Sequence, residues 1–266
     1  MSIFTADQLQ EFERDGCLLV RDLYTADEMA AMLDVARTDK AQQGAMNTGD
    51  AEGNTTRLKL TLDPEPRDDV FSALSCGQRM VERIEALMGA RPMHFHHKMM
   101  LKDPEVGGAW EWHQDYGYWY LHEKFPTPEL ISCFVAADRA TRENGCLQII
   151  RGSHRPGRIE HGTTGKQTGA DLRFVEALRE RDDMQHEYVE MEPGDGVFFH
   201  SNLLHRSDKN TSDHPRWTLV CCYNHPDNLP LDPEQRHKVC PIDDIVEDDQ
   251  LLPIAKEQLE DYTTPA

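Results

Sequence analysis

The chain has 266 residues, with 48 acidic and 28 basic side chains and a formal net charge of −20 at pH 7. A charge of this size repels polyanions, which argues against nucleic acid or an anionic membrane as a partner. The N-terminus has neither a basic start nor an apolar run long enough for secretion or membrane insertion. Seven cysteines without a metal-binding pattern indicate reduced thiols. We therefore expect a soluble, cytoplasmic protein.

Helices are predicted for residues 1–90. Thr5 to Gln8 and Thr25 to Glu28 have the pattern of capping boxes, in which a threonine hydroxyl and a Gln or Glu side chain satisfy free backbone amides. Each box precedes an amphipathic segment, and Cys17 to Val20 between them is typical of a short strand. Another helix is expected from Gln78 to Met88, where Val81, Ile84 and Leu87 form an apolar stripe.

From Pro92 the apolar pattern changes to a period of two, which is typical of strands. The expected strands are residues 94–102, 110–120, 130–138, 146–150, 187–191, 197–200, 203–205 and 216–223. The turn signal Asn144-Gly145 predicts that strands 130–138 and 146–150 pair antiparallel. Which face of strand 94–102 points inward cannot be read from the pattern alone.

Two polar segments are candidates for mobile lids. Residues 44–56 are glycine-rich without apolar periodicity, so they are expected to form a loop, either a lid or an ordinary surface loop. Residues 157–186 form a long excursion with a helix expected around 171–181. The tail, residues 225–266, contains one short expected helix near 254–259. With no repeat or domain linker apparent, we expect a single domain with its β core at about 92–224.

His113 and Asp115 lie two residues apart, so on an extended strand their side chains emerge from the same face. A third ligand is expected from a distant strand, and His205 lies in a strand-like apolar run. His154 is the alternative, although it lies in a predicted turn beside two arginines. Two histidines and one carboxylate with open positions form the ligand set of non-heme Fe(II) oxygenases.

Further residues extend this pattern into a resemblance. The sequence resembles the phytanoyl-CoA dioxygenase family of Fe(II)- and 2-oxoglutarate-dependent oxygenases, which includes ectoine hydroxylases. The matching residues are His113, Asp115, Asn144 to Gln148, Arg151 to His154, Pro193 to Asp195, His205, Ser207 and Arg216. The resemblance implies a mainly β fold with flanking helices and a double-stranded β-helix, or jelly-roll, core. It also implies consumption of 2-oxoglutarate and O2, release of succinate and CO2, and hydroxylation of a substrate carbon.

The resemblance assigns His113, Asp115 and His205 to iron and Arg216 with Ser207 to the distal carboxylate of 2-oxoglutarate. A guanidinium suits this task because it makes two parallel charge-assisted hydrogen bonds to a carboxylate. Lys98 is a further candidate contact for an anionic cosubstrate or substrate. Related halogenases carry a small residue in place of Asp115, so the carboxylate points to hydroxylation.

Trp119 is the main candidate for substrate contact. If the strand from residue 110 to 120 is regular, Trp119 shares the face of His113 and Asp115, and Tyr116 and Tyr118 lie close in sequence. The aromatic residues and the acidic composition favour a small polar metabolite that bears an ammonium or quaternary nitrogen, or a zwitterion. Two alternatives remain: a hydroxylase of an acyl or CoA-linked substrate, and a jelly-roll protein that binds a metal without redox chemistry.

Overall fold

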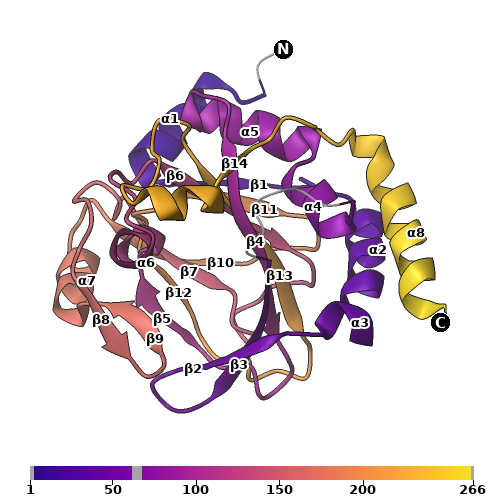
Figure 1. Ribbon diagram of the computed structural model, residues 1–266. Helices are drawn as coiled ribbons and strands as arrows, with labels where there is room; N and C mark the ends of the chain where they lie inside the picture. Colours follow the sequence, from indigo (N-terminus) through magenta and orange to yellow (C-terminus); the bar gives the residue numbers. More distant parts are fainter. Residues whose placement is uncertain (1–2, 62–67, 265–266) are drawn as a thin grey trace.

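Two antiparallel sheets face each other in the computed structural model, which describes residues 3–61 and 68–264 (Figure 1). The larger sheet contains, in spatial order, β1 (Cys17–Val20), β11 (Gly196–His200), β6 (Leu130–Ala136), β13 (Arg216–Asn224), β4 (Met93–Lys102), β3 (Thr55–Thr61) and β2 (Met46–Gly49), and β14 (Cys240–Pro241) also pairs with β4. The smaller sheet contains β10 (Gln185–Val189), β7 (Leu147–Arg151), β12 (His205–Ser207) and β5 (Trp110–His113). A separate hairpin is formed by β8 (His161–Thr164) and β9 (Gln167–Ala170).

Core strands alternate between the two sheets except at β7 and β10, which are joined by the excursion at residues 157–186 and pair in the smaller sheet. This arrangement gives a jelly roll and confirms the predicted fold class. The predicted pairing of residues 130–138 with 146–150 is wrong. Strand β6 pairs with β11 and β13, whereas β7 pairs with β10 and β12. The reason is that the turn at Asn144-Gly145 carries the chain across from the larger sheet to the smaller one.

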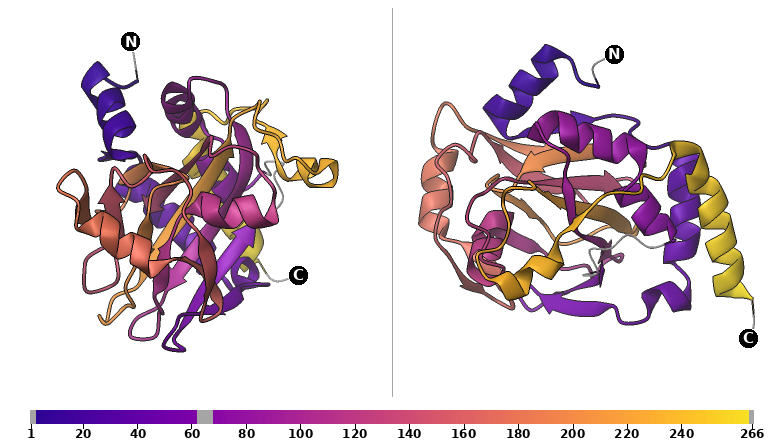
Figure 2. Two further views of the ribbon diagram at one scale, coloured as in Figure 1. Left: turned by 90° about the vertical axis from the view of Figure 1, so that its left-hand side faces the viewer. Right: turned by 45° about the horizontal axis from the view of Figure 1, so that its top comes forward.

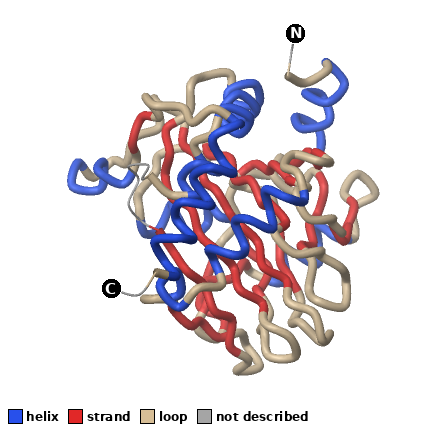
Figure 3. The backbone as a smooth tube through the Cα atoms, turned by 90° about the vertical axis from the view of Figure 1, so that its right-hand side faces the viewer, coloured by secondary structure: helices blue, strands red, loops and turns tan. Residues whose placement is uncertain are grey.

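Helices cover the outer face of the larger sheet (Figure 3). They are α2 (Ala26–Ala36), α4 (Val70–Ser75), α5 (Gln78–Met88) and α8 (Leu251–Thr263), whereas α1 (Ala6–Asp15) and the short α3 (Asp39–Gln42) lie near their ends. The capping boxes at Thr5 and Thr25 are confirmed, since each threonine hydroxyl accepts a hydrogen bond from the third helical amide and each cap amide donates back.

The helices decide which face of each strand points inward. Met99 and Leu101 of β4 and Leu219 of β13 pack in one buried cluster with the helices. Because side chains alternate along a strand, Lys98 and Arg216 must point to the opposite face, between the two sheets. The larger sheet is thus closed by apolar packing on one side and carries charged groups on the other.

For the polar segments, the structure corrects one prediction and confirms another. Residues 44–56 are not one continuous loop, because β2 and β3 pair as a hairpin that extends the larger sheet, and only residues 50–54 between them form its turn. Residues 157–186 contain the β8–β9 hairpin and α7 (Leu172–Arg179), so the helix expected in this segment is confirmed. Helix α7 lies on the side of the molecule opposite α8 (Figure 2). The tail contains the 3-10 helices η1 (Pro233–Lys238) and η2 (Asp248–Gln250) before α8. In the described part of the chain, no helix combines the length and apolarity that a membrane crossing requires.

The predicted strand 110–120 is wrong beyond His113. Strand β5 ends at His113, and α6 (Asp115–His122) follows directly. The last residue of β5 in register with β12 is His113, opposite His205, so the backbone beyond it has no partner strand among residues 3–61 and 68–264. A helix then satisfies those amides and carbonyls internally, although the aromatic residues of this segment favour a strand.

Candidate metal centre and active-site cavity

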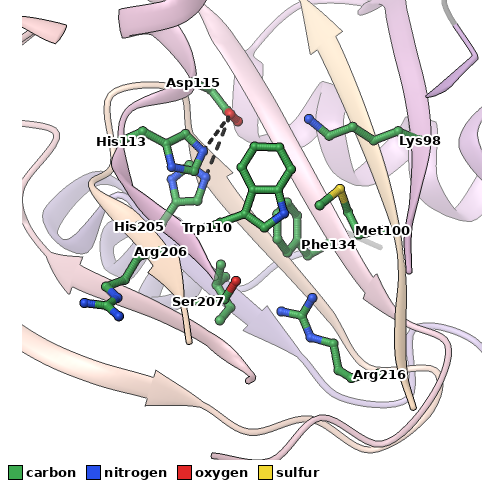
Figure 4. Close-up of a pocket in the computed structure, with 11 residues that line it drawn as sticks. Lys98, Met100, Trp110, His113, Asp115, Phe134, His205, Arg206, Ser207 and Arg216 are labelled. Atoms are coloured by element: carbon green, nitrogen blue, oxygen red, sulfur yellow. Dashed lines mark ion pairs between the residues drawn. The ribbon is translucent and has the colours of Figure 1, made fainter. Parts of the chain in front are cut away.

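His113, Asp115 and His205 meet between the two sheets. Asp115 Oδ1 lies 3.8 Å from Nε2 of His113 and 3.8 Å from Nε2 of His205. Because these separations are shorter than two metal–ligand bonds of about 2.1 Å each, one ion can contact all three residues. The close-up shows the three side chains converging at one end of the cavity (Figure 4).

Neighbouring groups fix how the three ligands present their atoms. Nδ1 of His113 donates to the Glu111 carbonyl at 2.7 Å, and Nδ1 of His205 donates to the Leu203 carbonyl at 2.9 Å. Each imidazole therefore turns an unprotonated Nε2 toward the carboxylate. The Ser132 hydroxyl donates to Asp115 Oδ2 at 2.7 Å, which leaves Oδ1 facing the histidines.

The local electrostatics keep the three groups in the form that binds a cation. Burial, followed by the charge of His205, lowers the pKa of His113 to about 3, and burial also lowers the pKa of His205. Burial alone would raise the pKa of Asp115, but His205, Lys98 and His113 outweigh it and lower the value. Near neutral pH the site thus offers two neutral imidazoles and one carboxylate, the ligand set typical of non-heme iron.

Arg216 lies at the other end of the same cavity and has no counter-ion among the described residues. Its side chain is buried, and Nε and Nη2 are enclosed without a hydrogen-bond partner. Burial lowers its pKa to about 10, so the guanidinium stays charged at neutral pH. Its partner in register on β4 is another basic residue, Lys102, whose pKa burial and the charge of Arg216 lower well below its usual value. An enclosed cation without a partner is costly, so the site is suited to an anion that completes it.

Ser207 and Lys98 line the same cavity. Ser207 belongs to the smaller sheet and Arg216 to the larger one, and both side chains point into the space between the sheets (Figure 4). Lys98 stands nearer the metal ligands, with its ammonium directed toward Asp115 (Figure 4). The structure therefore places the three predicted cosubstrate residues around one cavity.

Trp119, Tyr116 and Tyr118 do not line this cavity. Their positions follow from the helix that replaces the predicted strand. Trp119 is buried on the inner side of α6, with its ring edge-on to Phe95 at 5.4 Å. Tyr116 is buried and donates its hydroxyl to the Phe125 carbonyl, whereas Tyr118 is exposed.

Sequence reasoning missed the residues that form the walls of the cavity. Trp110 lines it, and the indole Nε1 is buried without a hydrogen-bond partner among the described residues. Met100, Phe134 and Leu147 supply the apolar lining. Met100 follows from alternation with Lys98, but no sequence signal distinguishes Phe134 or Leu147 from other core residues.

The alternative ligand His154 lies away from the cluster. Its ring packs 5.4 Å from that of His200, and Nε2 lies 3.1 Å from the Glu13 carbonyl at the end of α1. This histidine closes a contact between the turn after β7 and the N-terminal helix.

Comparison with known proteins gives one family. A model of the family described as phytanoyl-CoA dioxygenase (PhyH) matches residues 12–218. The chain is 29% identical over 179 residues to L-proline trans-4-hydroxylase of Streptomyces griseoviridis, a match that covers 62% of this chain and 67% of the relative. It is 25% identical over 240 residues to ectoine dioxygenase of Stutzerimonas stutzeri strain A1501, covering 84% of this chain and 78% of the relative.

A solved structure shares the fold. The crystal structure of EctD from S. alaskensis with 2-oxoglutarate and 5-hydroxyectoine superposes with a TM-score of 0.71 at 23% identity. The superposition covers 87% of this chain and 80% of that chain. The likeness in fold therefore extends over most of both chains.

The burial of Trp119 predicts that its replacement costs stability. Trp119→Ala should lower the free energy of unfolding by about 3–5 kcal/mol, and Trp119→Phe by less, because a large side chain leaves a cavity in the cluster around Phe95. Tyr118→Ala, on the exposed side of the same helix, is the control and should cost less than about 1 kcal/mol. Urea unfolding measures all three. A Trp119→Ala protein as stable as wild type that has lost turnover would instead place Trp119 in the substrate pocket.

Proposed function

Since the chain belongs to the phytanoyl-CoA dioxygenase (PhyH) family, we propose that it is an Fe(II)- and 2-oxoglutarate-dependent dioxygenase that hydroxylates an aliphatic carbon of a small zwitterionic metabolite. The observation that carries the proposal is one cavity with a metal-ligand cluster at one end and an uncompensated arginine at the other. A protein that only binds a metal has no need of a buried dicarboxylate anchor, so this pairing favours the oxygenase.

In this proposal His113, Asp115 and His205 hold Fe(II), which supplies the oxygen chemistry when bound. Arg216 and the Ser207 hydroxyl hold the distal carboxylate of 2-oxoglutarate, from facing sheets. The guanidinium is suited to two parallel hydrogen bonds, and its enclosed Nε and Nη2 are the groups that lack partners. Met100 and Phe134 exclude water along the cavity between the two ends.

The substrate class is supported by the charge of the cavity. Asp115 is the carboxylate among its lining residues, whereas Lys98, Arg206 and Arg216 are cationic. Arg206 is paired with Asp208, so Lys98 remains for a carboxylate near the metal, from either the cosubstrate or the substrate. The Trp110 ring offers a surface for an ammonium group. The relatives named L-proline trans-4-hydroxylase and ectoine dioxygenase support a small substrate rather than a CoA thioester.

The reaction class is tested by succinate formation from 2-oxoglutarate in the presence of Fe(II) and air. Wild-type protein should form succinate, and His113→Ala, Asp115→Ala and His205→Ala should reduce it to background, because each variant removes one ligand of the cluster. Circular dichroism should show that the fold is retained, since the apolar core does not depend on a metal. His154→Ala is the matched control and should stay active. Full activity in His205→Ala with loss in His154→Ala would show the third ligand to be wrong.

Arg216→Ala should raise the 2-oxoglutarate concentration needed for half-maximal succinate formation about a hundredfold or more. Loss of one partner of a buried charged pair costs about 3–5 kcal/mol, and each 1.4 kcal/mol is about tenfold. Arg216→Lys keeps the positive charge but cannot make two parallel hydrogen bonds to a carboxylate, so its 2-oxoglutarate requirement should lie between those of wild type and Arg216→Ala. Arg139→Ala, at an exposed ion pair with Glu192, is the control. An unchanged 2-oxoglutarate requirement in Arg216→Ala would contradict the anchor.

The substrate class is tested with matched pairs of an amino or imino acid and its amide, alongside an acyl-CoA set. The acids should trigger succinate release and gain the mass of one oxygen atom. Their amides should trigger less succinate release, because they lack the carboxylate. Lys98→Gln distinguishes the two roles of this cation: it raises KM for the acid if Lys98 binds substrate, and KM for 2-oxoglutarate if it binds cosubstrate. Triggering by acyl-CoA but by none of the acids would overturn the small zwitterion.

A further inference from the structure

Gln114 stands between the two neighbouring metal-ligand residues and is fully buried. Its side-chain Nε2 donates to the carbonyls of Gly157 at 2.9 Å and Asn202 at 2.8 Å, and Oε1 accepts from the Ile159 amide at 2.8 Å. One side chain therefore ties the His113–Asp115 turn to two other segments. One of them, at Asn202, leads directly into the strand that carries His205.

The backbone of Gln114 is fixed by His161, the first residue of β8. Its Nε2 accepts from the Gln114 amide at 2.9 Å, and its Nδ1 donates to the Ile159 carbonyl at 2.9 Å. The ring also lies against Gly117 of α6, where an added Cβ would come within 2.1 Å of it. Only a glycine at this position lets the imidazole approach the turn so closely.

The second strand of the same hairpin supports β5. Gln167 Oε1 accepts from the Glu111 amide at 3.0 Å, and Nε2 donates to the Ala109 carbonyl at 2.9 Å. One edge of β5 pairs with β12, and these two bonds to the residues flanking Trp110 occupy backbone groups that β12 leaves free. The Gln167 amide thus acts in place of a neighbouring strand.

We infer that Gln114, His161 and Gln167 are positioning residues, which hold His113 and Asp115 in binding geometry before the metal arrives. The inference rests on the proposed function, because it takes the cluster as a metal site. The physical reason is that two imidazole lone pairs and a carboxylate facing one point do not attract each other without a cation. The surrounding hydrogen bonds must therefore hold these groups in place. Gln114, His161 and Gln167 connect the segment that carries His113 and Asp115 to β8, to β9 and to the turn at Asn202. The polar excursion at residues 157–170 is accordingly a support for the site rather than a lid.

The test is metal binding by the full-length apoprotein, with Co(II) as the probe. Gln114→Ala and His161→Phe should raise the dissociation constant for Co(II) about 10–100-fold, the usual effect of losing the outer partners of metal ligands. Both should also alter the Co(II) d–d absorption at saturating metal, a change that loss of stability alone does not produce. His161→Gln should recover most of the affinity, since its amide supplies one acceptor and one donor as the imidazole does. Thr163→Ala, at an exposed residue of the same hairpin, is the control and should match wild type.

Gln167→Leu keeps the inference testable if Gln114→Ala does not fold, because it removes only the two bonds to β5. Like Gln114→Ala, this variant should raise the dissociation constant for Co(II). Folded Gln114→Ala or Gln167→Leu protein that binds Co(II) within about twofold of wild type, with an unchanged spectrum, would overturn the inference. If wild type binds Co(II) with the expected variant effects but forms no succinate with Fe(II), the oxygenase proposal fails and the positioning role stands. A wild-type protein that binds no metal would contradict both the oxygenase proposal and the positioning role.

Discussion

The pairing of β12 with β5 is the contact on which the site depends. His205 lies in register with His113, so two residues far apart in sequence project to the same side of adjacent strands. Their ring centroids are 4.1 Å apart, which leaves little freedom for either imidazole. Strand β12 is also held by β7 on its other edge, with His205 opposite Ile149. Within the part of the chain that the structure describes, β5 has no second neighbouring strand, so the precision of the cluster depends on how well this edge strand is held.

The cavity and the protein as a whole have opposite electrostatic character. The chain carries a net charge of −20, yet the charged lining of the cavity is mostly cationic. Both features have physical reasons: surface carboxylates interact through water, where they are strongly screened, while enclosed groups act at short range in a low dielectric. Net charge therefore acts on large polyanions that approach the surface but says little about the group that binds inside. The acidic composition describes the surface of the protein, whereas the buried arginine shows that the cavity is suited to an anion.

The sequence was informative wherever a local rule operates. Capping boxes, the apolar stripe of the helix at residues 78–88 and the strand period of β4 depend on neighbouring residues, and the structure has these elements as expected. The partner of β7 could not be predicted, because a turn signal such as Asn144-Gly145 does not say whether the chain returns to the same sheet. The wall residues Phe134 and Leu147 have no signal at all, since any apolar strand residue fits a core equally well. Gln114 could have been noticed as a polar residue between two ligands, but its partners at 157, 159 and 202 are visible only in three dimensions.

The expectation that side chains alternate along a strand from residue 110 to 120 placed His113 and Asp115 on one face correctly, but it misplaced the aromatic residues that follow. The turn from β5 into α6 explains this difference. His113 and Asp115 need only one extended residue between them, and Gln114 has that conformation. From Asp115 onward the chain rises about 1.5 Å per residue instead of about 3.3 Å, so Trp119 lies about 6 Å along α6 rather than about 13 Å away. Its ring therefore packs edge-on against Phe95 and His96 of β4. Of the aromatic residues of α6, Tyr116 and Trp119 are therefore buried in the cluster around Phe95, and the cavity is lined instead from the inward faces of the sheets, where Lys98 and Trp110 lie.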